Sequence, residues 1–148
     1  MRLSVRLLGA LLAFALAVTD VAAQQVVTTC GASSGYGYYL EPRTGWSTDG
    51  IANGALTILR DAAGQYDLVI KDAGSSFSAK GDGAKVFKVD GDDDQRFTLV
   101  VVYPLPVTEM YQFTLDQSGR GTVIWAAVKN GLLARVTKGS LFTATCSK

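Results

Sequence analysis

The sequence predicts an all-β fold, a small antiparallel up-and-down barrel whose two ends are tied by one disulfide. Short runs rich in Val, Ile, Thr, Tyr and Phe recur between clusters of Gly, Asp and Ser. No segment carries a sustained apolar period of about 3.6 residues with caps at both ends. The connections between the runs are short, so neighbouring strands should be antiparallel. A β-sandwich is the alternative architecture.

Nine strands are expected, each a short run of β-branched, aromatic or alternating residues bounded by turn formers. In chain order they are Gly37–Glu41, Leu56–Arg60, Tyr66–Lys71, Lys85–Asp90, Phe97–Tyr103, Met110–Asp116, Thr122–Val128, Leu132–Thr137 and Ser140–Cys146. The Ala, Leu, Lys and Arg content of two segments, Ala55–Asp61 and Val123–Arg135, also suits a helix. Asn130-Gly131 argues against a helix in the second of these segments.

The turns between these strands are defined by their residue types. Residues that tolerate a positive φ or bond to their own backbone occur at Asp61–Gly64, Gly91–Asp94, Gln117–Gly121 and Asn130–Gly131. Alternation along the strands then assigns the faces that form the core. These faces are Phe97, Leu99, Val101 and Tyr103; Tyr111, Phe113 and Leu115; and Val123, Trp125 and Ala127.

Residues 1–23 are expected to be a secretory signal peptide. Arg2 and Arg6 precede the apolar stretch Leu7–Val18, and Val21-Ala22-Ala23 supplies small residues for a signal peptidase. Twelve apolar residues span about 18 Å as a helix, short of the roughly 30 Å hydrocarbon core. We therefore expect a periplasmic or secreted protein that begins at Gln24 and is not embedded in a membrane.

Residues 24–148 have the size of one domain, and their charge indicates no polyanionic partner. The chain has 14 basic and 13 acidic residues, and with Arg2, Arg6 and Asp20 in the leader the rest balances at twelve of each sign. The basic residues are scattered, so nucleic-acid binding is not expected. Cys30 and Cys146, near the two ends of an exported chain, are expected to form a disulfide that ties the first strand to the last.

The chain contains no histidine, which removes the usual general base and the commonest transition-metal ligand. No enzymatic activity and no cofactor are expected. A hydrolase that uses a pair of carboxylates is the remaining catalytic alternative, and it would need two acids in one cleft. The candidate acids are Glu41, Asp49, Asp67, Asp72 and Glu109.

The run Asp90-Gly91-Asp92-Asp93-Asp94 is the sharpest polar feature. Asp90, Asp92 and Asp94 have the alternate spacing of a calcium loop, but Gln95 and Val101 replace the glycine and glutamate that an EF-hand requires. The run is interpreted as an acidic hairpin tip, with a weak calcium site as the alternative and no metal site otherwise expected.

Aromatic residues and glycines concentrate between Gly31 and Trp46. Tyr36, Tyr38, Tyr39 and Trp46 are the candidate residues for binding a ligand or partner, because tyrosines beside flexible glycines make adaptable surfaces. An ordinary first strand packed on the barrel is the alternative interpretation.

Near the C-terminus, Ser118-Gly119, a strand with Trp125, Lys129-Asn130-Gly131 and a final strand ending in Cys146 follow one another. This order resembles the periplasmic inhibitors of C-type lysozyme, over about a fifth of the chain. The resemblance implies that Ser118 and Lys129 enter a lysozyme cleft. Arg120-Gly121-Thr122 stands where that family has an aromatic residue, and Asn130 separates the lysine from the glycine. The whole layout also resembles uncharacterised exported single-disulfide β-proteins of Gram-negative bacteria.

These observations together predict a non-catalytic exported binding protein. Its ligand would be a small apolar molecule held in a barrel mouth, or a protein docked on the loops. The alternative is an inhibitor of an envelope hydrolase such as lysozyme.

Overall fold

The computed structural model describes residues 24–40, 44–72, 74–91, 93–131 and 136–148. The expected signal peptide, Glu41, Asp92 and part of the expected strand Leu132–Thr137 lie outside these ranges. The described residues form ten strands: β1 (Gln25–Tyr39), β2 (Gly45–Asp49), β3 (Ala55–Arg60), β4 (Tyr66–Asp72), β5 (Ser75–Ser78), β6 (Lys85–Asp90), β7 (Arg96–Val102), β8 (Val107–Leu115), β9 (Gly121–Lys129) and β10 (Lys138–Ser147).

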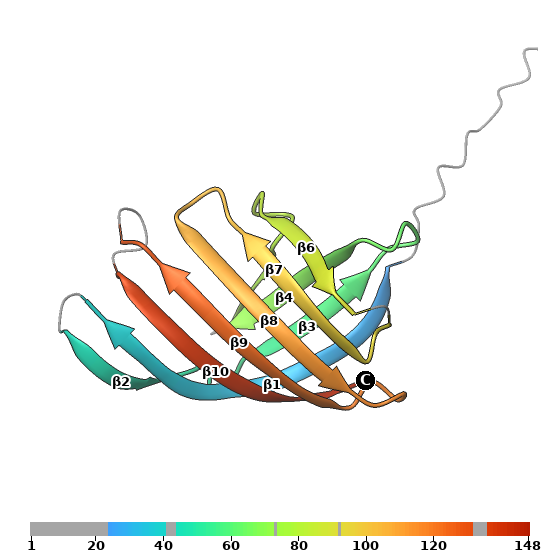
Figure 1. The fold of residues 1–148 in the computed structure, drawn as a ribbon, viewed down its shortest axis with the longest axis horizontal. Helices are drawn as coiled ribbons and strands as arrows, with labels where there is room; N and C mark the ends of the chain where they lie inside the picture. Colours follow the sequence, from blue (N-terminus) through green and yellow to red (C-terminus); the bar gives the residue numbers. More distant parts are fainter. Residues whose placement is uncertain (1–23, 41–43, 73, 92, 132–135) are drawn as a thin grey trace, which may run out of the picture.

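All ten strands belong to one antiparallel sheet that curls into a half-barrel (Figure 1). The order is β5-β4-β3-β1-β10-β9-β8-β7-β6, with β2 paired to β1. Two meanders therefore meet where the first strand pairs with the last. The all-β, antiparallel prediction is confirmed, and the described strand residues of the two segments with helical composition belong to β3 and β9, which ends at Lys129. In the described part of the chain, β5 and β6 end the sheet and are not paired with each other.

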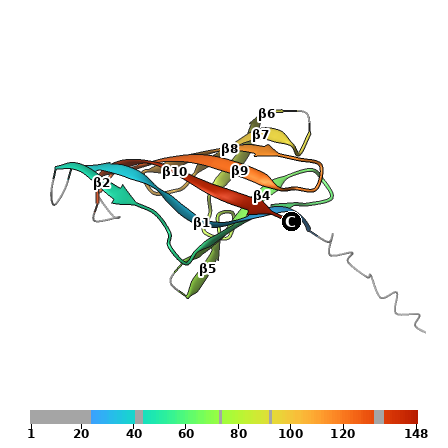
Figure 2. The ribbon, with the colours of Figure 1, turned by 90° about the horizontal axis from the view of Figure 1, so that it is seen from below.

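Strand β1 is longer than the sequence predicted and pairs with three other strands. Its first part, from Gln25 to Cys30, pairs with β3, and its last part, from Gly35 to Tyr39, pairs with β2. A bulge between Cys30 and Ser33 separates the two parts. Figure 2 shows β1 and β2 extending together away from β5.

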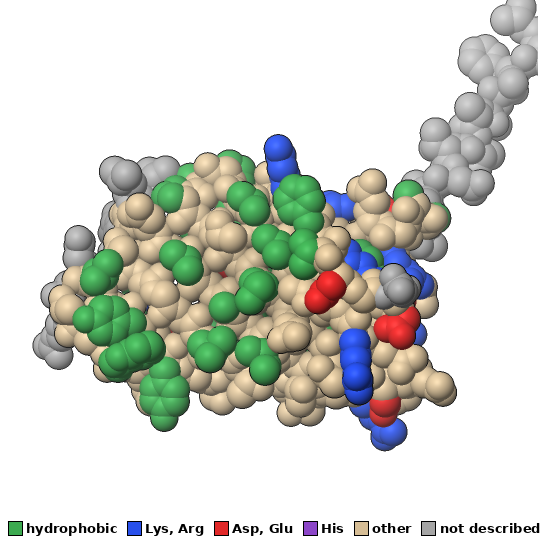
Figure 3. Space-filling model, in the orientation of Figure 1, with side chains coloured by type: hydrophobic (Ala, Val, Ile, Leu, Met, Phe, Trp, Pro, Cys, Tyr) green, Lys and Arg blue, Asp and Glu red, His purple; other side chains and the backbone are tan. Residues whose placement is uncertain are grey.

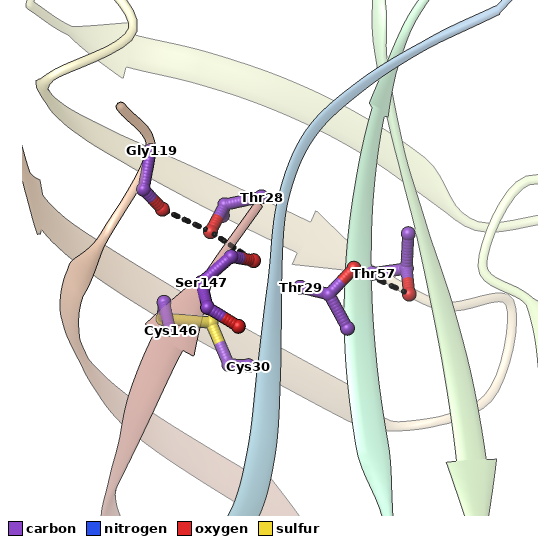
Figure 4. Close-up of a disulfide and its surroundings, with 7 residues drawn as sticks. All are labelled: Thr28, Thr29, Cys30, Thr57, Gly119, Cys146 and Ser147. Atoms are coloured by element: carbon purple, nitrogen blue, oxygen red, sulfur yellow. Dashed lines mark hydrogen bonds between the residues drawn. A yellow bond between two sulfur atoms is a disulfide. The ribbon is translucent and has the colours of Figure 1, made fainter. Parts of the chain in front are cut away.

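The Cys30–Cys146 disulfide joins β1 to β10, as predicted. The two residues are direct cross-strand partners with Cα atoms 3.8 Å apart, and both are buried. Beside the bridge, the Thr28 hydroxyl donates a 2.7 Å hydrogen bond to the Gly119 carbonyl (Figure 4). The ends of the chain are therefore fixed to the β8–β9 turn as well as to each other.

An aromatic ladder fills the concave side of the half-barrel. Ring centroids lie 4.7 Å apart for Phe97 and Phe113, 5.4 Å for Tyr111 and Trp125, and 4.6 Å for Trp125 and Phe142. All five side chains are buried. The predicted core faces of β7, β8 and β9 are confirmed, with Tyr103 packed partly buried against the core.

A polar contact brings the two ends of the sheet together. Arg60 of β3 forms a 2.5 Å ion pair with Asp94 in the β6–β7 turn, and the Tyr66 hydroxyl of β4 donates to the same carboxylate. Burial first, and then the charge and hydrogen bond of Asp94, raise the pKa of Tyr66 to about 12. Side-chain contacts therefore join β3 and β4 to the β6–β7 turn, and among the described strands no backbone pairing joins them.

Candidate functional site

A cavity of about 530 Å³ opens on the concave side of the sheet between β4–β5 and β7–β8, and we call it the concave cavity. Ile70 and Phe77 come from β4 and β5, and Tyr103, Leu105 and Val107 come from β7–β8 and their connection. Ile70 is buried and Phe77 packs partly buried against the core. The volume lies in the range of small-molecule sites, and these walls are mostly apolar.

Glu109 is a buried carboxylate that lines this cavity. It is 5% exposed and lies opposite Val101 and Ala127 in the neighbouring strands. The Tyr111 hydroxyl donates to its Oε2 at 2.6 Å, and the Tyr103 hydroxyl donates to the same oxygen at 3.3 Å. Charge-assisted hydrogen bonds of this kind compensate a buried carboxylate for the water it has lost.

The two phenols are held in their donating form. Burial is the largest cause that raises the pKa of Tyr103 and of Tyr111 above 10.0, and the charge and hydrogen bond of Glu109 raise both further. For Tyr103, the charges of Asp82 and Asp67 act in the same direction. Burial and these three acids therefore disfavour ionisation of the Tyr103 hydroxyl.

Two further charged residues line the cavity with opposite signs. Asp82, in the β5–β6 connection, is exposed, and Lys129, at the end of β9, is half-buried. Lys129 is two residues beyond Ala127, the cross-strand partner of Glu109, and so lies on the same face of the sheet. No ion pair between Lys129 and Glu109 is present among the described residues.

The predicted aromatic residues are divided between the two faces of the sheet. Tyr36, Tyr38 and Trp46 share the outer face, where the rings of Tyr38 and Trp46 meet edge to face at 5.3 Å and Trp46 is 73% exposed. Tyr39 lies on the inner face, beneath the ammonium group of Lys138. Sequence alternation alone could have separated Tyr39 from the other three.

An outer groove of about 550 Å³ adjoins the outer aromatic residues, and Tyr36, Ile124 and Leu141 line it. Figure 3 shows hydrophobic side chains exposed on one face of the molecule. Exposed apolar residues also lie along other strands, so this groove is less distinct in composition than the concave cavity.

Two of the candidate acids, Asp67 and Asp49, are engaged in holding the fold. Asp67 accepts hydrogen bonds from Ser78 and from the Leu68 and Lys80 backbone amides. Asp49 of β2 pairs with Lys138 on the concave face, whereas Glu109 of β8 lines the concave cavity, and β1, β10 and β9 lie between the two strands. Asp49 and Glu109 therefore do not share a cleft.

The acidic hairpin tip is also committed to structural contacts. Asp94 binds Arg60 and Tyr66, Asp93 accepts hydrogen bonds from the backbone amides of Gln95 and Arg96, and Asp90 is exposed at the end of β6. Asp92 lies outside the described residues. Within the described ranges, no group of three acids, cysteines or histidines is arranged to hold a metal ion.

Ser118 and Lys129, the residues implied by the resemblance to lysozyme inhibitors, lie at opposite ends of β9. Ser118 is in the β8–β9 turn, where it donates to Asp116 at 2.6 Å, and Lys129 is the last residue of the strand. Nine strand residues span about 30 Å. The two side chains therefore do not belong to one hairpin tip.

No family model, curated protein or solved structure matches the chain. Among the described residues, no helix has the length and apolar character needed to span a membrane. The concave cavity and its buried glutamate are the strongest candidate site, and the sequence marks Glu109 as a candidate acid but has no local pattern that places it in a cavity.

Proposed function

We propose that this protein is a non-catalytic, exported binding protein that holds a small, largely apolar molecule in the concave cavity. The observation that carries the proposal is the combination of a cavity of about 530 Å³, apolar walls and one buried polar anchor. Small-molecule sites have this composition, because apolar walls supply affinity and a few placed polar groups fix orientation.

The absence of histidine and the separate locations of Asp49 and Glu109 support binding over catalysis. Inhibition of an envelope hydrolase is less well supported, because the separation of Ser118 and Lys129 would require two distant contacts. Export is supported by the buried Cys30–Cys146 disulfide, which forms and persists in oxidising compartments.

The binding proposal is tested with N-phenyl-1-naphthylamine, a neutral apolar fluorophore. We expect a saturable fluorescence increase, and we expect Leu105→Lys, which places a charge in the cavity wall, to weaken binding at least about tenfold. Leu141→Lys is the matched control, because Leu141 is also an exposed leucine but lies on the outer face. Binding that is absent, or that is weakened equally by both variants, would overturn the proposal.

Export is tested by expressing the whole chain in a Gram-negative host and measuring the intact mass of the periplasmic protein. We expect a chain that begins at Gln24 and is two hydrogens lighter than its reduced form. A protein that retains residues 1–23 and stays in the cytoplasm would contradict export.

A further inference from the structure

We infer that the molecule held in the concave cavity carries a positively charged amine or amidine group, which pairs with Glu109. This inference rests on the proposed function and names the chemical class of its ligand. The ligand would be a cationic amphiphile, with an apolar body against Ile70, Phe77 and Leu105 and its charged group at the carboxylate.

The sign of the ligand charge follows from which charged group of the cavity is buried. Glu109 is 5% exposed, and within the described residues its two side-chain hydrogen bonds both end on Oε2. A carboxylate oxygen has two lone-pair sites, so a carboxylate with donors on one oxygen retains capacity to accept from an ammonium group. A buried carboxylate without a cationic partner is costly, and an ammonium or amidinium group would lower that cost.

The charges at the cavity rim do not reverse this sign. Asp82 and Lys129 both line the cavity and carry opposite charges. They are exposed and half-buried respectively, so solvent screens each of them more than it screens Glu109. The net charge of the three lining groups is negative, and the least screened of them is the glutamate.

The acids beyond the cavity lining reinforce the negative potential. Asp67 is buried, and its charge acts on Tyr103 together with the charges of Asp82 and Glu109. The Tyr103 hydroxyl donates to Glu109 and its residue lines the same cavity, so these three acids act on the space that the ligand would enter. An anionic ligand would meet like charges there, and like charges in a poorly hydrated site repel strongly.

The charge preference is measured with three probes that share one alkyl chain: decylammonium, 1-decanol and decanoate. Isothermal titration of the mature protein at neutral pH gives the three dissociation constants. We expect decylammonium to bind at least about tenfold more tightly than decanol, and decanoate to bind least tightly. Equal binding of the three probes, or tightest binding of decanoate, would overturn the inference and leave the proposed function intact. Failure of all three to bind would overturn the proposed function itself.

Glu109→Gln tests the assigned residue, because glutamine keeps the shape and removes the charge. We expect the ratio of decylammonium to decanol affinity to fall to about one, because both probes then meet an uncharged amide. Thermal unfolding establishes that the variant is folded. If it does not fold, Asp82→Asn at the exposed rim provides the second measurement, with an expected two- to threefold loss confined to decylammonium. A full preference for decylammonium in folded Glu109→Gln would contradict the inference, and so would a decylammonium affinity that rises, or a decanol affinity that falls equally, in Asp82→Asn.

Discussion

The side chains of Asp49 and Lys138 form an ion pair on the concave face, and it links β2 to β10 across β1. Both side chains are about 15% exposed, and Ser140 donates a further hydrogen bond to Asp49. Strand β2 pairs with β1 alone among the described strands. The ion pair therefore supplies a second attachment for a strand that has one hydrogen-bonded neighbour.

Lys138→Met should lower the free energy of unfolding by about 2 kcal/mol, because it leaves the half-buried Asp49 carboxylate without its cation. Urea denaturation at pH 7 measures the change. Lys129→Met is the matched control, since Lys129 lies opposite Lys138 in the β9–β10 ladder and forms no ion pair within the described part of the chain. Equal losses of unfolding free energy in the two variants would show that the ion pair does not help to hold β2 in place.

The same pair has a defined pH window. Burial would raise the pKa of Asp49, but hydrogen bonds from Lys138 and Tyr39 and the Lys138 charge outweigh it and hold the pKa below 3.8. Burial would lower the pKa of Lys138, but Asp49 and Tyr39 outweigh it and raise the pKa above 10.5. A lowered carboxyl pKa stabilises the fold above about pH 3.8, and this contribution is lost as pH falls through the folded pKa. A raised lysine pKa stabilises the fold below about pH 10.5, and this contribution is lost as pH rises through the pKa of the folded state.

The difference in unfolding free energy between the wild type and Lys138→Met should therefore be largest between about pH 4 and pH 10. It should shrink at both extremes, where one partner of the pair loses its charge. Denaturant titrations from pH 3 to pH 11 would show this profile, and a difference that does not change with pH would contradict it.

The disulfide should contribute about 3 to 5 kcal/mol, because it closes a loop with a sequence separation of 116 residues. The double variant Cys30→Ala, Cys146→Ala is expected to show a urea midpoint lowered accordingly. Reduced wild-type protein is the control and should match the double variant. Two proteins of equal stability, with and without the bridge, would show that the direct pairing of β1 and β10 suffices.

Much of the fold follows from local sequence signals, because turns and alternation are local properties. Three predicted turns contain glycines with positive φ, Gly64, Gly91 and Gly119, as their chemistry requires. Ala55–Arg60 and Val123–Lys129, the strand parts of the two segments with helical composition, each pair with strands on both sides. Strand-forming context therefore outweighed the helix propensity of their alanines and leucines.

The features that the sequence did not predict depend on contacts distant in the chain. The sequence predicts a first strand that begins at Gly37, but β1 begins at Gln25, because β3 pairs with Gln25–Cys30 and β10 pairs with the Gly- and Ser-rich part that follows. Strand β2 contains one large apolar residue, Trp46, and was missed for that reason. The cavity also unites residues from Ile70 to Lys129, and no local pattern indicates that union.

Gly35→Ala should be destabilising by about 2 kcal/mol or more. A Cβ atom at Gly35 would lie 2.0 Å from the Leu141 carbonyl oxygen, so β1 and β10 would have to separate locally. Gly31→Ala is the matched control in the same strand, because a Cβ atom there meets nothing within 4 Å. Thermal unfolding of the two variants measures the difference, and equal midpoints would show that the β1–β10 spacing adjusts freely.

Lys129→Met tests how the cavity balances its charges. Lys129 is the basic residue among the groups that line the cavity, and it shares the inner face with Glu109. Removing it should strengthen decylammonium binding two- to fivefold and weaken decanoate binding, with decanol unchanged, because the negative potential of Glu109 is then less opposed. Titrations in 50 mM and 500 mM salt should show the effect reduced at high salt. Stronger decanoate binding in this variant would contradict the prediction, because it would mean that Glu109 does not govern which ligand charge the cavity prefers.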